Sequence, residues 1–224
     1  MKVAGLLVLV SVVFLCSCSL TNQSHPETPA FSVTLVPLYV GDFKLVMIPS
    51  DAIIDLKDDS VGQRLSQLAE EGRLFIFYGE SSSPTPLPEE GYRAARAEAF
   101  VKISQFVELR VQSVEWKLSA AISTVSLPSN LMTMTESLVK RAIQISSNTQ
   151  FSGARDIVRY RLDRPGELDR YVVIVLFDPE TLMASLKMSE EYLHIKESSE
   201  AAGTNGRIFF EELNRALEEA FKSL

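Results

Sequence analysis

The chain has 224 residues, of which 46% are hydrophobic and 23% charged, and this composition predicts one folded domain with appendages rather than a disordered protein. The formal charge of -7 and the pI near 5.0 argue against nucleic-acid binding, which needs a concentration of Lys and Arg. The same charge gives no electrostatic reason to bind an anionic membrane surface.

The N-terminal 17 residues have the composition of an export signal. Lys2 supplies a positive charge, and Val3 to Leu15 form an apolar run of 13 residues, which suits a signal peptide but is short for a membrane span. Residues 1–17 are therefore predicted to be a signal peptide. Removing Lys2 leaves 21 basic and 29 acidic residues, a net charge of -8.

Two cysteines lie at the predicted cleavage junction, in Leu15-Cys16-Ser17-Cys18, and no other cysteine occurs in the chain. This segment resembles a bacterial lipobox, with an aliphatic residue at -3 and a small residue at -1. The resemblance implies lipidation of Cys18 by acyl chains, with palmitate as one of them; Cys16 at -2 departs from the usual pattern. Ser19 is compatible with sorting to the outer membrane. The alternative is an ordinary signal peptide with incidental cysteines.

Residues 18–30 are predicted to be the lipidated cysteine and a flexible tether, because residues 19–30 are polar and contain two prolines. These 12 residues reach at most about 40 Å when extended. A folded α+β domain is expected over residues 31–224. It opens with a hairpin, formed by Phe31–Val40 and Phe43–Ile48 around a turn at Gly41-Asp42.

The next elements are predicted from caps and periodicity. A capping-box spacing at Ser60 to Gln63 predicts a short helix that ends at Gly72. The apolar run Leu74–Tyr78 is expected to be a buried strand, and Gly79–Pro88 a surface loop. A long helix should run from Glu89 to about Leu118, with small alanines that let it approach a sheet closely.

The second half is predicted to contain a helix, a hairpin and two more helices. A capping-box spacing at Thr133–Glu136 predicts the start of a helix. Asp156–Leu162 and Tyr171–Phe177 flank a Pro-Gly turn, and the second of these strands is apolar throughout, so it should be central in the sheet. Asp178-Pro179-Glu180 is typical of a helix start.

The C-terminal segment is predicted to be an amphipathic helix over residues 206–224, preceded by a flexible stretch at Ser198–Gly206. Its apolar stripe contains four residues, which are Phe209, Leu213, Leu217 and Leu224. The stripe should either dock on the chain's own sheet or cover a partner's groove or a neighbouring copy.

Catalytic and metal-binding patterns are missing from the sequence. The only histidine after the tether is His194, no Gly-x-Ser-x-Gly motif occurs, and neither a phosphate loop nor a Cys/His cluster is present. We expect no enzyme activity, cofactor or metal, and His194 on a helix surface. The acid pairs Asp58-Asp59 and Glu89-Glu90 are interpreted as helix-start acids.

Five arginines form the one basic concentration: Arg155, Arg159, Arg161, Arg164 and Arg170. Strand alternation predicts the first three on one face. A solvated sheet edge is favoured over a surface that binds an anionic polymer.

A family resemblance covers residues 73–178. The strand Leu74–Tyr78, a Ser-rich loop, the Ala-rich segment Tyr92–Ala99, a second helix and the hairpin that ends with Tyr171–Leu176 resemble the outer-membrane lipoprotein family of the Helicobacter twenty-kilodalton antigen, which includes flagellar assembly lipoproteins similar to FlgP. Pro84, Pro86 and Pro88 depart from the pattern. The resemblance implies an α+β domain without catalysis, used in envelope assembly, motility or surface exposure.

Together these features predict a single mixed or antiparallel sheet with helices packed on it, preceded by the signal peptide and tether. The expected function is that of a lipid-anchored protein of the cell envelope, at the outer membrane, with a structural, assembly or surface role. Its expected partners are the membrane, through acyl chains on Cys18, and a homo-oligomer or an envelope protein, but not nucleic acid. The alternative is a module that binds a lipid or small hydrophobic ligand between the Ala-rich helix and the aromatic strand of Phe75, Phe77 and Tyr78.

Overall fold

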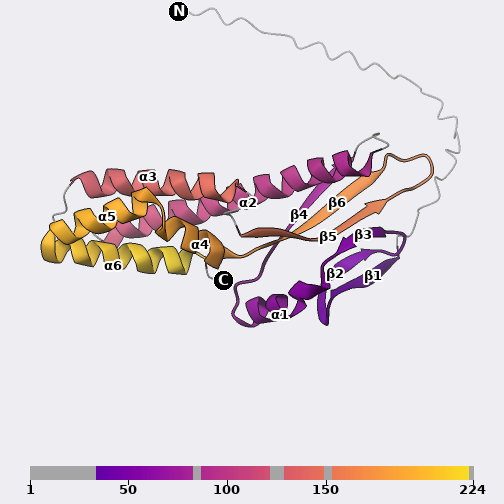
Figure 1. Ribbon diagram of the computed structural model, residues 1–224, viewed down its shortest axis with the longest axis horizontal. Coiled ribbons are helices and arrows are strands. Elements are labelled where there is room, and N and C mark those ends of the chain that lie inside the picture. Colours follow the sequence, from indigo (N-terminus) through magenta and orange to yellow (C-terminus); the bar gives the residue numbers. More distant parts are fainter. Residues whose placement is uncertain (1–33, 83–86, 122–128, 149–152, 222–224) are drawn as a thin grey trace, which may run out of the picture. The chain divides into compact units, whose positions relative to one another are not determined.

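The computed structural model describes residues 34–82, 87–121, 129–148 and 153–221 (Figure 1). The predicted signal peptide, Cys18 and the tether lie outside the described residues. The described chain contains both helices and antiparallel strands, which confirms the α+β class. Its strands form two sheets, whereas the sequence predicted one.

The larger sheet has four antiparallel strands in the order β3 (Ile53–Lys57), β5 (Ala154–Leu162), β6 (Arg170–Phe177) and β4 (Phe75–Ser82). Strand β6 lies between β5 and β4, and all seven residues from Tyr171 to Phe177 are buried. The prediction that Tyr171–Phe177 is a central strand and the prediction that it is covered on both faces are therefore confirmed. An apolar side chain at every position is stable only where both faces of the strand are covered.

The turn between β5 and β6 also agrees with the prediction. Gly166 has a φ of +82°, and the Glu167 N–H donates to the Arg164 carbonyl at 3.0 Å. A positive φ at the third residue is what a Pro-Gly type II turn requires.

The smaller sheet is the N-terminal hairpin of β1 (Leu35–Val40) and β2 (Phe43–Pro49). Gly41 in its turn has a φ of +57°, a conformation that glycine adopts without steric cost. The predicted hairpin and its turn are confirmed. The hairpin pairs only with itself, so it forms a separate layer (Figure 1).

Two hydrophobic clusters cover the two faces of the four-stranded sheet. On one face Tyr171, Val173, Val175 and Phe177 join the side chains of the long helix α2 (Pro88–Ala121). On the other face the alternate residues of β6 join side chains of the hairpin and of α1 (Gly62–Glu70), and these are Val172, Ile174 and Leu176. The period of two along β6 thus divides the core into two halves.

Helix α2 approaches the sheet very closely at Gly79. A Cβ atom added to Gly79 would lie 1.7 Å from the carbonyl oxygen of Ala95, and Ala95 and Ala99 are fully buried. The predicted packing of the Ala-rich helix on the sheet is confirmed. Strand β4 however continues through Gly79 to Ser82, so the predicted loop begins too early. Gly79 marks a close approach of two backbones rather than the end of a strand.

The second half of α2 belongs to a helical bundle. Helix α2 contacts α3 (Ser129–Ser146) and α6 (Gly203–Ala220), and α5 (Glu190–Ala201) contacts the same two helices, which closes a ring of four (Figure 1). The short helix α4 (Pro179–Lys187) begins with Asp178, whose side chain accepts the N–H of Glu180. This confirms the predicted helix start.

Helix α3 begins four residues before the predicted capping box. Leu131 is fully buried, and Thr135 lies inside the helix, where its hydroxyl donates to the Leu131 carbonyl at 3.0 Å. A buried leucine one turn upstream stabilises the longer helix, and an internal threonine satisfies its hydroxyl on the preceding turn. The predicted capping box at Thr133 is therefore wrong.

The predicted flexible stretch at Ser198–Gly206 is also wrong. Helices α5 and α6 occupy it and meet at Gly203, which has a φ of +70°. A Cβ added to Gly206 would lie 2.0 Å from the Ser199 carbonyl oxygen, so the small residues let two antiparallel helices touch. The composition indicated a linker because small and polar residues occur both in flexible linkers and where two helices pack closely.

The apolar stripe of the last helix docks on the chain itself. Phe209, Leu213 and Leu217 are buried, and α6 packs on α2 and α5 rather than on the sheet. The self-docked alternative is the one the structure has, with helices as the docking surface. Leu224 lies outside the described residues.

Helix α1 is capped differently from the prediction. Its N-cap, Val61, makes no side-chain cap hydrogen bond, whereas Asp58 caps a preceding 3₁₀ turn at Asp59–Val61 by accepting the Ser60 N–H at 3.2 Å. The capping box predicted at Ser60 is not formed. Aspartate is a good cap for two reasons. Its carboxylate accepts the hydrogen bond of a free backbone N–H, and its negative charge is stabilised by the positive end of the helix dipole.

Candidate functional site

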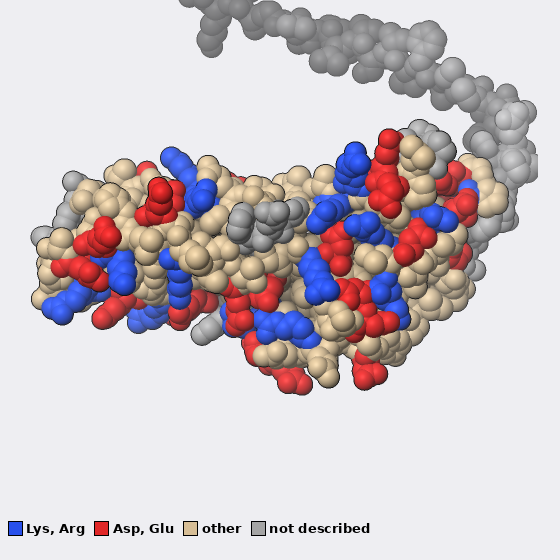
Figure 2. All heavy atoms as spheres, in the orientation of Figure 1, with Lys and Arg blue, Asp and Glu red and all other residues tan. Residues whose placement is uncertain are grey.

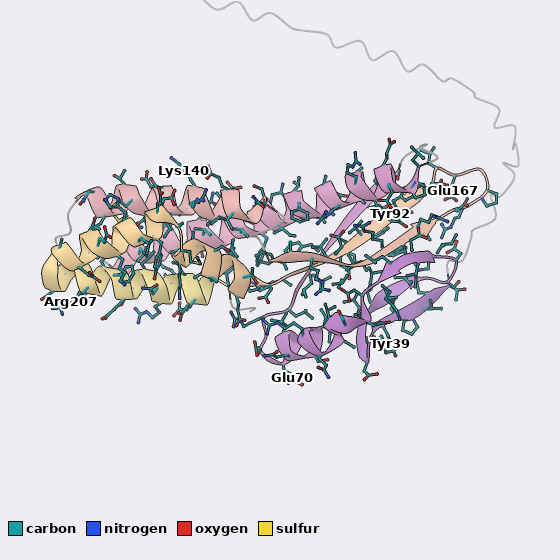
Figure 3. All side chains as sticks on the ribbon, viewed as in Figure 1. Tyr39, Glu70, Tyr92, Lys140, Glu167 and Arg207 are labelled. Carbon is teal, nitrogen blue, oxygen red and sulfur yellow. The ribbon has the colours of Figure 1, made fainter. Side chains whose placement is uncertain are left out.

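A group of connected ionisable side chains lies between α2 and strands β3 and β5. Tyr92 of α2, labelled in Figure 3, donates its hydroxyl to Asp55 Oδ2 at 2.5 Å. Arg161 Nη1 lies 3.0 Å from the same oxygen. The guanidinium of Arg159 stacks 5.8 Å from the centre of the Tyr92 ring. Burial, and then the hydrogen bond to Asp55, raises the pKa of Tyr92 far above its usual range.

A nearly buried carboxylate completes this group. The side chain of Asp156 is 8% exposed, and its Oδ2 accepts from Arg159 Nη2 at 2.7 Å. Its Oδ1 lies 3.1 Å from Arg96 Nε as an ion pair that lacks hydrogen-bond geometry. Each arginine of the group thus has a carboxylate partner, and buried charges are stable only when paired in this way.

The remaining arginines of the predicted basic patch are paired as well. Arg155 contacts Asp58, Arg164 Nε lies 2.7 Å from Asp51, and Arg170 contacts Glu80. Positive and negative side chains alternate over this part of the surface (Figure 2). Neutralised arginines offer little attraction to an anionic polymer, which agrees with the interpretation that was favoured.

The position of the patch differs from the prediction in two respects. Strand β5 lies inside the sheet between β3 and β6, so the patch is not on an edge strand. The register of β5 against β6 shifts between Asp156 and Val158. This bulge turns Arg155 away from the α2 face, on which Arg159 lies, because an extra residue reverses the alternation of side chains.

The other single residues considered from the sequence have the expected environments. His194 is exposed on α5, beside a surface hollow of about 350 Å³ that Glu190 and Glu191 also line. Asp58 is a capping residue, and Glu89 and Glu90 lie in the first turn of α2. Among the described residues, no group of three or more His, Cys, Asp and Glu is arranged to hold a metal ion.

The space proposed for a hydrophobic ligand is occupied by aromatic rings. Phe75 and Phe77 of β4 contact Phe106 of α2, with ring centroids 4.8 and 5.5 Å apart, and Phe106 lies 6.1 Å from Phe177. Tyr78 is 39% exposed, as alternation places it on the opposite face from Phe77. Phe75, Phe77 and Phe106 are partly buried and pack against the core, where their contacts fix α2 on the sheet.

An exposed apolar surface lies on the outer side of the β1–β2 hairpin, and the sequence analysis did not identify it. Leu35 pairs with Pro49, Pro37 with Met47, and Tyr39 follows after a bulge. We call the exposed Leu35, Pro37, Tyr39 and Met47, together with the partly buried Pro49, the hairpin face. Leu38, Val40 and Ile48, on the inner side, are buried.

A sequence signal for the hairpin face does exist. A half-buried hairpin normally alternates apolar and polar residues, yet Leu35 to Val40 is apolar at all six positions. Such a strand should be covered on both sides. In the described chain the inner side is covered at Leu38, Val40 and Ile48, although Val36 is 37% exposed, whereas the outer side is open and is therefore an interaction candidate.

The chain was compared with protein-family models, with curated proteins and with solved structures, and none of them matches it. Within the described ranges, no helix is long and apolar enough to cross a membrane.

Proposed function

We propose that the protein is a lipid-anchored lipoprotein of the bacterial cell envelope, attached through acyl chains on Cys18. The observation that carries this proposal is the segment Leu15-Cys16-Ser17-Cys18 directly after an apolar run of 13 residues. Two or three acyl chains anchor a protein durably, because each buried methylene contributes about 0.8 kcal/mol.

The folded body is proposed to act by contact with other envelope components, in a structural, assembly or surface role at the outer membrane. Support comes from the polar contacts that hold α2 on the sheet, in which Asp156 pairs with Arg96 and Asp55 accepts from the Tyr92 hydroxyl. The exposed hairpin face offers a contact surface. A part in motility is the more specific form of this proposal, and it depends on the family resemblance of residues 73–178.

Metabolic labelling with an alkyne fatty acid tests the anchor. The wild-type chain should carry the label and fractionate with membranes, and Cys18→Ser should lose both properties. Cys16→Ser is the matched control, two residues away, and should keep them. Labelling that depends on Cys16 instead would refute the assignment of the acceptor.

Binding of a lipid or small hydrophobic ligand is a second candidate function. The hollow between α4 and α6 has a volume of about 390 Å³, within the range of small-molecule sites. Met183, Ala184 and Phe221 form its apolar lining, and four charged residues complete it: Arg73, Glu180, Lys187 and Glu218. Native mass spectrometry of the protein released from detergent distinguishes the two functions. A lipid retained at one per chain supports binding, whereas an empty oligomer supports assembly.

A further inference from the structure

The hairpin face is apolar and open to solvent. Leu35 is 53% exposed, Tyr39 46% and Met47 42%, and Pro37 between them is exposed as well. Cross-strand partners lie about 5 Å apart, so these side chains form one continuous surface across both strands. Figure 3 shows where Tyr39 lies on this hairpin.

Charge at this hairpin is low. Between Thr34 and Ser50 the ionisable charged residues are Asp42, in the turn, and Lys44, which is the exposed cross-strand partner of Tyr39 at the turn end of the hairpin. They carry opposite charges, so the segment has a net charge of zero. A ligand for the hairpin face would therefore be held by its apolar surface and not by ion pairing.

The anchor and the hairpin are close along the chain. Leu35 follows Cys18 by 17 positions, a contour of at most about 60 Å. For the flexible tether that the sequence predicts, this length corresponds to a root-mean-square span of about 20 to 25 Å. If Cys18 is lipidated, the bilayer is presented to the hairpin at a high effective concentration, at which even a weak contact is occupied.

A second copy of the chain is a poorer occupant for this surface. A stable interface buries roughly 800 Å² on each partner. The hairpin face has five side chains, and the largest ones, Tyr39 and Met47, are less than half exposed. A contact with a membrane to which the chain is already tethered needs less buried area. The anchor has already removed most of the translational freedom that two free partners would lose on binding.

We propose that the hairpin face rests on the lipid surface of the membrane in which Cys18 is anchored, an inference that depends on the proposed lipidation. Tyr39 suits this position, since its ring is apolar and its hydroxyl can stay at the level of the headgroups. The contact would hold the β1–β2 layer against the bilayer.

The test uses the full chain in bacterial membranes that contain a phospholipid with a photoactivatable acyl chain. After irradiation, the cross-linked peptides are identified by mass spectrometry. Lipid adducts should concentrate in residues 35–49. Met47→Glu and Tyr39→Glu should each lower these adducts about tenfold, because a carboxylate has to be kept out of the apolar phase.

Leu109→Glu is the matched control. Leu109 is 68% exposed on α2, so it presents more apolar surface than Met47 but lies on another layer. This variant should leave the adducts in residues 35–49 unchanged. An unaltered melting temperature for each variant shows that it is folded.

The outcomes separate the inference from the proposed function. A chain that carries the fatty acid but forms no adducts in residues 35–49 overturns the inference and leaves the anchor standing. Cross-links from the hairpin face to a second copy, or to residues 19–33, also overturn it. A chain without fatty acid refutes the anchor, and the inference with it.

Discussion

Replacing Gly79 by alanine should separate the long helix from the sheet. The added Cβ would lie 1.7 Å from the carbonyl oxygen of Ala95 and 2.8 Å from the backbone nitrogen of Ala99. Both contacts are with the backbone of α2, so no side chain can rotate away. Even glycine at position 95 would bring no relief, because the carbonyl oxygen would still be there.

The magnitude follows from these distances. Ordinary contacts of a Cβ begin near 3.4 Å, so α2 has to move by 3.4 minus 1.7, or about 1.7 Å. Such a shift loosens the fully buried Ala95, Ala99 and Ile103 from the sheet. Overpacking a core costs typically 1–3 kcal/mol, and a backbone clash belongs at the upper end, so we expect a loss of about 3 kcal/mol. For a domain of this size the melting temperature should fall by about 6–12 °C.

Thermal and urea unfolding of the purified protein measure this loss. Gly166→Ala is the control, since its Cβ would meet nothing within 4 Å and only the positive φ of +82° is strained. That strain should cost about 1–2 kcal/mol. If Gly79→Ala destabilises the protein no more than Gly166→Ala does, the close approach of α2 to β4 is refuted.

Three further predictions concern the core and its charges. Asp156→Asn should lower the free energy of unfolding by about 3 kcal/mol, because Arg96 and Arg159 lose the charge of their nearly buried partner. Glu89→Gln, at an exposed position, should change the free energy of unfolding by under about 0.5 kcal/mol. Equal losses for the two variants in urea unfolding would contradict this prediction. The raised pKa of Tyr92 gives stability that is fully present below the usual tyrosine pKa of about 10 and is lost as the pH rises toward the pKa in the folded state. Tyr92→Phe should therefore reduce the fall of the melting temperature at alkaline pH. An unchanged dependence of the melting temperature on pH would refute the hydrogen-bonded tyrosine. Phe209→Ala should lower the free energy of unfolding by about 3–5 kcal/mol in urea, because the Phe209 ring is fully buried in the chain's own helical bundle. Ile208 is about half exposed, so Ile208→Ala is the control. If the two variants are equally stable, α6 does not dock on the bundle.

The sequence predicted those elements whose patterns are local. The apolar run Tyr171–Phe177 required cover on two faces and is central in the sheet, and Asp178-Pro179-Glu180 begins a helix because all three residues favour that end. The Pro-Gly turn before β6 was also predicted, since glycine at that position relieves a positive φ. In each case the physical cause lies within a few residues.

Features that depend on distant contacts needed the tertiary structure. Gly79 and Gly206 looked like a strand end and a linker end, but each is small because another backbone touches it. The five arginines looked like a basic patch until their partners, such as Asp51 more than a hundred residues away, were placed beside them.

The difference between what the sequence predicts and what only the tertiary structure decides is clearest at the N-terminal end of the folded domain. By itself the sequence predicts a lipobox-like segment at Cys18, because processing signals are read as linear motifs, and it determined the hairpin of β1 and β2, which the structure has. Only the tertiary structure decided that the inner side of this hairpin is buried and its outer side is open. The strand Leu35–Val40 is apolar at every position, so its composition could not distinguish the two sides, and only packing against α1 and the sheet makes them different.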